Sequence, residues 1–106
     1  MERREQIEYL IGRLLEEIPQ FKTQAAAFPS EYPARRRLLR SLMNLRPPLP
    51  LDTDFLRVQD ELLAAEREER GAVDADSLPT VPGYPKLALW QGDITTLCCD
   101  AIVNAA

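Results

Sequence analysis

Hydrophobic residues recur every three or four positions through the N-terminal part of the chain, and this spacing predicts amphipathic helices. The first predicted helix covers about residues 3–18 and ends at Pro19, because proline cannot continue the hydrogen bonding of a helix. Its apolar side chains form one stripe: Ile7, Leu10, Ile11, Leu14, Leu15 and Ile18. A stripe of this kind predicts that one face of the helix packs within the same protein.

Two further helices are predicted before residue 75. One runs from Pro33 to Met43, since proline suits the first turn of a helix. The other begins after Asp52, whose carboxylate can cap the N-terminus, and Gly71 is expected to end it. The predicted apolar faces consist of Leu38, Leu39, Leu42 and Met43 in the second helix and of Phe55, Val58, Leu62 and Ala65 in the third. We expect the three apolar stripes to need further protein to cover them, which would leave the isolated chain loosely packed.

The C-terminal part follows a different pattern. Two short apolar runs, "KLALW" and "CDAIVNAA", predict strands of a parallel or mixed sheet that is buried on both faces. The segment "DADSLPTVPGYP" before them contains three prolines and one glycine, which is typical of a connector. The sequence therefore predicts an α/β protein with a helical extension at 1–75, a proline-rich connector at 76–85 and the start of a sheet domain at 86–106.

Composition and charge exclude several classes of partner. The 106 residues include 17 acidic and 13 basic side chains, and the net charge of −4 gives no general attraction for nucleic acid or an anionic membrane. No apolar run approaches the roughly 20 residues of a membrane helix, and "MERREQIEYL" lacks the apolar core of a secretory signal. The two cysteines are adjacent and make a poor disulfide framework, so a cytoplasmic location is expected. The absence of histidine excludes catalysis by an imidazole base.

The segment "QGDITTL" between the two apolar runs carries the most specific candidate chemistry. Gly92 lets the backbone turn and lets a ligand approach closely. Asp93 then follows a predicted strand, and open α/β sheets bind nucleotides at the ends of their strands. Its carboxylate could accept from the exocyclic amine of adenine while the backbone N–H of Ile94 donates to a ring nitrogen. In the alternative interpretation Asp93 caps the short helical turn "ITTL", and the spacing alone favours neither.

Two stretches of the sequence together resemble a known family. "LWQGDITTLCCDAIVNAA" resembles the start of a macrodomain, whose usual opening is a strand, Gly-Asp-Ile-Thr, and Asp-Ala-Ile-Val-Asn-Ala-Ala-Asn. "LMNLRPP" and "FLRVQD" resemble the helical extension of the zinc-dependent macrodomain ADP-ribosyl hydrolases, a group often encoded beside a sirtuin of the M class. The resemblance implies the N-terminal part of such a hydrolase: a helical extension followed by the first strands of a three-layer α/β/α macrodomain.

The family's functional residues can be carried over only in part. Asp93, the Ile94 backbone and Gly92 match the adenine-binding motif, while Asn104 and Ala106 match the retained part of the next motif. The asparagine near the distal ribose and the zinc ligands would lie beyond residue 106, so no catalytic or metal-binding residue is assigned in this chain. The implied partners are ADP-ribose or an ADP-ribosylated protein, and a sirtuin-type protein. The alternatives are a non-catalytic ADP-ribose-binding module and a helical interaction domain.

The two adjacent cysteines have a separate prediction. If Cys98 and Cys99 lie in a strand, their side chains point to opposite faces and cannot chelate one ion. We therefore expect both to be small apolar residues of a half-buried strand.

Overall fold

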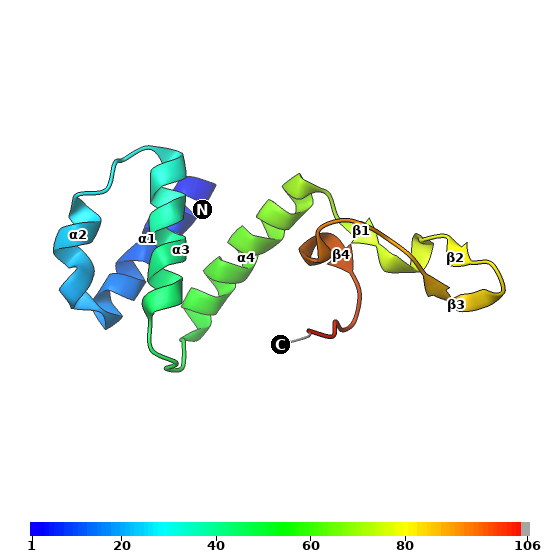
Figure 1. Cartoon of the computed structure of the whole chain (residues 1–106). Coiled ribbons are helices and arrows are strands. Elements are labelled where there is room, and N and C mark those ends of the chain that lie inside the picture. Colours follow the sequence, from blue (N-terminus) through cyan, green and yellow to red (C-terminus); the bar gives the residue numbers. More distant parts are fainter. Residues whose placement is uncertain (105–106) are drawn as a thin grey trace. The chain divides into compact units, whose positions relative to one another are not determined.

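The computed structural model describes residues 1–104, which divide into two compact units (Figure 1). The first unit covers Met1–Leu63 and consists of helices, and the second begins at Ala64 and contains the strands. The boundary between the two units lies within a helix, α4. The sequence's prediction of a mixed α and β composition is confirmed, but the strands form only two small sheets and not a three-layer fold within the described residues.

The helical unit contains the three helices that the hydrophobic spacing predicts, with small shifts at their ends. Its elements are α1 (Arg3–Glu17), a 3₁₀ turn at Pro19–Phe21, α2 (Lys22–Ala26), α3 (Tyr32–Leu45) and the first part of α4 (Thr53–Arg70). The helix α2 was not predicted, because its five residues are too few to show a periodic apolar pattern. Among the described residues, no helix is both long enough and apolar enough to cross a membrane.

Local chemistry explains where these helices begin and end. The Asp52 carboxylate caps α4 and accepts a hydrogen bond from the Phe55 N–H at 2.7 Å, as the sequence predicts. Gly71 follows the last residue of α4 with a φ of +89°, a conformation that glycine adopts without steric cost. Pro19 ends α1 and opens the 3₁₀ turn that follows.

The apolar stripes of the helices pack against one another. One core cluster includes residues from every helix of this unit: Ile7, Leu10, Ile11, Leu14, Ile18, Ala25, Leu38, Leu39, Leu42, Phe55, Val58 and Leu62. Each fully buried Val, Leu, Ile or Phe side chain contributes about 1.5–3 kcal/mol relative to its exposed state. The expectation that the stripes need further protein to cover them is therefore wrong for this unit. The spacing predicted each face correctly, but sequence alone did not show that the faces complement one another.

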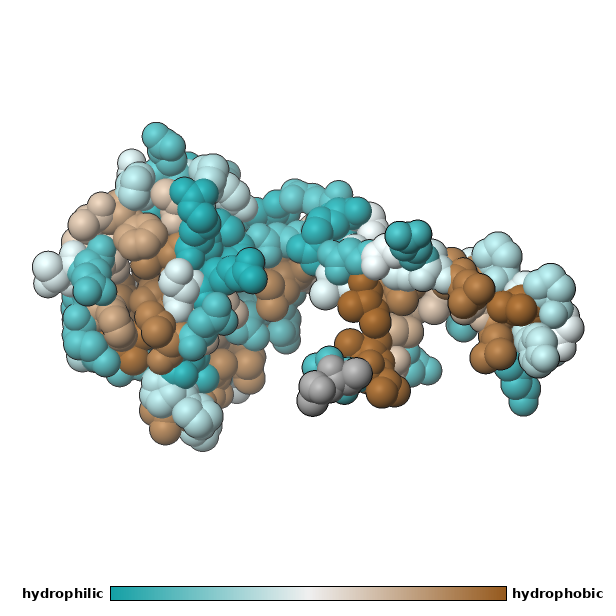
Figure 2. All heavy atoms as spheres, viewed as in Figure 1, coloured by the Kyte–Doolittle hydropathy of each residue, from teal (hydrophilic) through white to brown (hydrophobic). Residues whose placement is uncertain are grey.

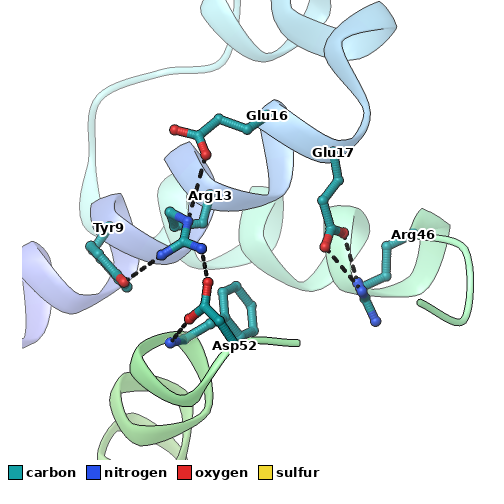
Figure 3. A network of polar contacts seen from close by, with 7 residues as sticks. Tyr9, Arg13, Glu16, Glu17, Arg46 and Asp52 are labelled. Atoms are coloured by element: carbon teal, nitrogen blue, oxygen red, sulfur yellow. Dashed lines mark hydrogen bonds and ion pairs between the residues drawn. The ribbon is translucent and has the colours of Figure 1, made fainter. Parts of the chain in front are cut away.

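Polar contacts at the edge of this core join α1 to Asp52, which precedes α4, and to Arg46, which follows α3 (Figure 3). The Arg13 guanidinium donates to the Tyr9 hydroxyl at 2.8 Å and forms ion pairs with Asp52 and Glu16. Asp52 thus caps α4 with one carboxylate oxygen and binds Arg13 with the other. These contacts fix the position of the α4 N-terminus against α1.

The second unit contains short strands and two capped 3₁₀ turns. The strand β1 (Val73–Asp74) pairs in parallel with β4 (Leu97–Cys98), with Val73 opposite Leu97 and Asp74 opposite Cys98. The strands β2 (Thr80–Val81) and β3 (Tyr84–Ala88) form an antiparallel hairpin around Gly83, whose φ is +81°. The segment 76–85, expected to be a connector, therefore contributes to this hairpin.

Two strand predictions need correction. The run "KLALW" overlaps β3, but the run "CDAIVNAA" begins after β4 ends at Cys98, and residues 99–104 have no helix or strand. The predicted burial on both faces is also wrong, since every residue of β3 is exposed and Leu89 and Val103 are 85% and 96% exposed. Figure 2 shows hydrophobic residues on the surface of this unit. Two-stranded pairs without a covering layer cannot bury an apolar face.

Candidate functional site

The candidate site lies in the Asp93 turn, residues 92–96, which connects β3 to β4. Residues Ile94–Thr96 form a 3₁₀ turn, and Asp93 is its N-cap. The Asp93 Oδ1 accepts hydrogen bonds from the Thr95 N–H at 2.9 Å and from the Thr95 hydroxyl at 2.7 Å. The Thr96 N–H and hydroxyl both donate to the Asp93 carbonyl, at 2.9 and 2.7 Å. The helix-cap interpretation of Asp93 is thus what the structure shows.

The cap leaves part of the turn available to a ligand. Both side-chain bonds fall on Oδ1, and Asp93 itself is exposed. Two hydrogen bonds lower the pKa of the Asp93 carboxyl below its ordinary value: the one from the Thr95 hydroxyl has the larger effect, and the one from the Thr95 N–H adds to it. The group is therefore ionised at neutral pH. Ile94 is the first residue of the turn, where no carbonyl of the turn itself can accept the backbone N–H. An ionised acceptor and a backbone donor therefore lie on adjacent residues.

A tryptophan that the sequence analysis did not assign packs beside this turn. The half-buried Trp90 ring lies so close to Gly92 that a Cβ at position 92 would meet its Cη2 at 2.6 Å. Glycine is required here because any side chain would displace the ring. The signal was present as "WQGD", in which an aromatic residue precedes the turn. Trp90 thus belongs to the candidate site as a residue that shapes the turn.

Of the other residues that match the family's motifs, Asn104 is not brought to this turn. Asn104 is exposed in a stretch without regular structure, and no hydrogen bond joins it to the Asp93 turn within residues 1–104. Ala106 lies outside the described residues.

A second aspartate of this unit also caps a 3₁₀ turn. Asp74 caps the 3₁₀ turn Ala75–Ser77 in the same way: its Oδ1 accepts from the Asp76 N–H at 3.1 Å, and its Oδ2 accepts from the Ser77 hydroxyl at 2.8 Å. The sequence around it, "VDADSL", has the Asp-x-polar-hydroxyl pattern of "GDITTL". The Asp74 turn uses both carboxylate oxygens, whereas the Asp93 turn uses one.

A hollow of about 460 Å³, which we call the β4 hollow, lies beside the β1–β4 pair of this unit. It is lined by Arg67, Asp74, Ala75, Asp76, Leu97, Cys98, Cys99 and Asp100. Both cysteines are free and exposed, so their predicted place in a half-buried strand is wrong. Only Cys98 is part of a strand, because β4 ends there.

Zinc does not fit the residues present. A structural zinc site takes four protein ligands and a catalytic site takes three. Within residues 1–104, no group of three or more Cys, Asp or Glu side chains is arranged to hold a metal ion. The described part of the chain therefore offers no zinc site.

The whole chain is similar to curated bacterial proteins. It is 40% identical over 108 residues to a protein-ADP-ribose hydrolase of Treponema medium, a match that covers 100% of this chain and 41% of that protein. It is 38% identical over 100 residues to the protein-ADP-ribose hydrolases of Staphylococcus aureus strains Mu50 and MRSA252, with 94% of this chain and 36% of each relative covered. This chain is a partial-length relative of these hydrolases.

The chain spans about two fifths of the length of the curated relatives that it matches. No protein-family model matches it. The match to the Treponema medium protein includes both the helical unit and the Asp93 turn, because it extends over the whole chain.

Proposed function

We propose that this chain is part of a macrodomain-type enzyme that removes ADP-ribose from modified proteins. The similarity to protein-ADP-ribose hydrolases over the whole chain carries the proposal. The chain would contribute the part of the site that holds adenine, in the Asp93 turn. The catalytic centre would depend on the remaining length of such a protein, so residues 1–104 are assigned to binding alone.

In this proposal the Asp93 turn reads the edge of adenine. The Asp93 Oδ2 accepts from the exocyclic amine, and the Ile94 N–H donates to a ring nitrogen. Thr95 supports the arrangement because its two hydrogen bonds to Oδ1 hold the carboxylate in one orientation. A carboxylate that is already oriented loses less conformational freedom on binding. The cap and the adenine contact are thus compatible functions of the same residue.

Zinc enters the proposal only through the resemblance. In the zinc-dependent group, the metal would orient the substrate or activate water. Since the described residues hold no zinc ligand set, its ligands would belong to another part of the protein. An ADP-ribosylated protein as substrate, a sirtuin-type partner and a cytoplasmic location stay predictions of the same resemblance.

A chimaera tests the proposal directly. Residues 1–106 replace the matching segment of the Treponema medium hydrolase, which restores the length of the relative. We expect the chimaera to bind ADP-ribose in a calorimetric titration and to release it from an ADP-ribosylated protein. Asp93→Ala should weaken binding roughly tenfold or more, because the adenine donors lose their acceptor. Asp74→Ala is the matched control, since it removes the equivalent cap without removing the proposed adenine contact.

The outcomes separate the hypotheses. Binding without turnover would support a non-catalytic ADP-ribose-binding module. A folded chimaera that neither binds nor hydrolyses, beside an active parent hydrolase, would contradict the proposal. Equal binding by Asp93→Ala and Asp74→Ala would leave Asp93 as a cap alone.

A further inference from the structure

Two exposed cysteines are consecutive residues of the second unit. Cys98 and Cys99 are both free, both exposed and both part of the lining of the β4 hollow. The predicted alternation that would point them to opposite faces applies within a strand, and β4 ends at Cys98. Cys99 is therefore not constrained by the pairing of β4 with β1.

The separation of adjacent residues decides what the pair can bind. The Cα atoms of neighbouring residues lie about 3.8 Å apart across a trans peptide, whereas a disulfide usually needs about 4.4–6.8 Å. A direct disulfide between these residues is thus strained. An atom that bridges the two sulfurs enlarges the ring and removes this strain.

The residues around Cys98 and Cys99 restrict which kind of atom can bridge the two sulfurs. Zinc and similar ions need three or more protein ligands, and no such group is arranged within residues 1–104. The carboxylates of the hollow, Asp74, Asp76 and Asp100, are hard ligands, whereas thiolates prefer soft centres. The pair therefore suits a soft centre that takes only two sulfur ligands from the protein and carries its third substituent with it.

We propose that Cys98 and Cys99 form a binding site for monosubstituted trivalent arsenicals, R–As=O. Each thiol adds its sulfur to arsenic, so that two S–H bonds and the As=O bond break and two As–S bonds form. The two thiol protons and the oxygen leave as one water molecule, and no atom changes its oxidation state. The substituent R occupies the β4 hollow, whose volume of about 460 Å³ accommodates a phenyl group.

The chelate explains the expected selectivity. Once one sulfur has bound arsenic, the second thiol is held next to it at a high effective concentration. Two linked contacts of this kind raise the overall affinity by about 100-fold or more over a single contact. A monothiol such as glutathione should then fail to displace the arsenical, and a dithiol should remove it.

The test uses phenylarsine oxide with the reduced 106-residue chain. Intact-mass analysis should show one phenylarsenic group in place of two thiol hydrogens. The adduct should withstand about 100-fold more glutathione than the adducts of Cys98→Ser or Cys99→Ser, and 2,3-dimercaptopropanol should release it. The double variant Cys99→Ser/Ser41→Cys is the matched control, because it keeps two thiols but places one on α3 in the helical unit.

The result that would overturn the proposal is equally specific. Two arsenicals on one chain, or equal resistance of the parent and the single variants to glutathione, would show that the thiols act independently. The absence of any adduct on the parent would also overturn the proposal, because it would show that the two thiols do not bind the arsenical. Far-UV circular dichroism of each variant checks that the helices are intact, and both cysteines are exposed, so serine should leave the fold unchanged.

Discussion

The helical unit buries its apolar side chains, whereas the unit that begins at Ala64 leaves many of its own exposed. Leu10, Leu14 and Leu39 are 0% exposed in the first unit, while Leu87 and Leu89 of the second are 57% and 85% exposed. The two units are similar in that hydrophobic residues occur regularly in both. They differ in whether these residues pack against one another within the described residues.

The difference follows from how each element satisfies its backbone. A helix makes its hydrogen bonds within a few residues, so α1 and α3 need only their apolar faces covered, and they cover each other. A strand needs a partner strand along its whole length. Here Val73 pairs with Leu97, far along the chain, and the pairing extends over only two residues. The described strands therefore form without enough neighbours to bury a face.

The largest expected effect on the free energy of unfolding comes from replacing a buried leucine of the first unit, and an exposed leucine of the second unit serves as the comparison. Leu39→Ala should lower the free energy of unfolding by about 2–5 kcal/mol, because it leaves a cavity in the core. Leu87→Ala should change it by less than about 0.5 kcal/mol, since the side chain is largely exposed. Urea unfolding followed by far-UV circular dichroism measures both free energies. Similar losses for the two variants would contradict the contrast between the units.

The second prediction concerns the cap of α4. Asp52→Ala removes the hydrogen bond to the Phe55 N–H and the ion pair with Arg13, so it should lower the free energy of unfolding by about 1–2 kcal/mol. Asp52→Asn keeps a cap but loses the charge, and it should cost less. Asp93→Ala removes a cap in the second unit and should leave the urea midpoint of the helices unchanged. A shift of that midpoint with Asp93→Ala would show that the two units unfold together.

The sequence predicted the helical unit more accurately than the second unit for physical reasons. The stripe of α1 and the cap at Asp52 are local features, and both occur as predicted. The length of each strand depends on pairing with residues far along the chain, so "CDAIVNAA" was predicted as a strand although β4 ends at Cys98, before this run begins. The hairpin around Gly83 was missed because its prolines suggested a connector.

In the candidate site, too, the local features were predicted from the sequence and the contacts between side chains were not. The local pattern "GDITT" left two roles open for Asp93, a cap and an adenine contact, and the hydrogen bonds to Thr95 show the cap. The contact of Trp90 with Gly92 was not predicted, because it depends on the orientation of a side chain that the pattern does not specify. The adenine contact stays a prediction, as does any role for Asn104.

The third prediction is a smaller electrostatic effect in the helical unit. Arg35 donates two hydrogen bonds to Glu8, at 2.7 and 2.8 Å, and they lower the pKa of the Glu8 carboxyl below its ordinary value of about 4.5. Because the folded pKa is lowered, the pair stabilises the fold fully above that ordinary value and loses its effect as the pH falls through the folded pKa. Glu8 is 43% exposed, so solvent screening limits the effect to less than about 1 kcal/mol.

Glu8→Gln isolates this pair. At neutral pH the variant should have a lower urea midpoint than the parent, and at a pH below the folded pKa the two midpoints should coincide. Added salt should reduce the difference at neutral pH because it screens exposed charges. A difference that persists unchanged at low pH would mean that Glu8 contributes through packing and not through its charge.

The smallest effect is confined to the Asp93 turn. The Thr95 hydroxyl and N–H lower the pKa of the Asp93 carboxyl below its ordinary value of 3.8, so the capped form is favoured above that value and is lost as the pH falls through the folded pKa. Thr95→Val removes the hydroxyl donor and keeps the N–H, and it should raise the Asp93 pKa part of the way back. Thr96→Val is the matched control, because the Thr96 hydroxyl donates to the Asp93 carbonyl and not to its carboxylate. The carboxyl carbon signal of Asp93, followed by NMR from neutral to acidic pH, measures each pKa.

Equal pKa values in the parent and in Thr95→Val would show that the Thr95 hydroxyl does not hold the carboxylate, and the proposed orientation of Oδ2 toward adenine would then lack its support.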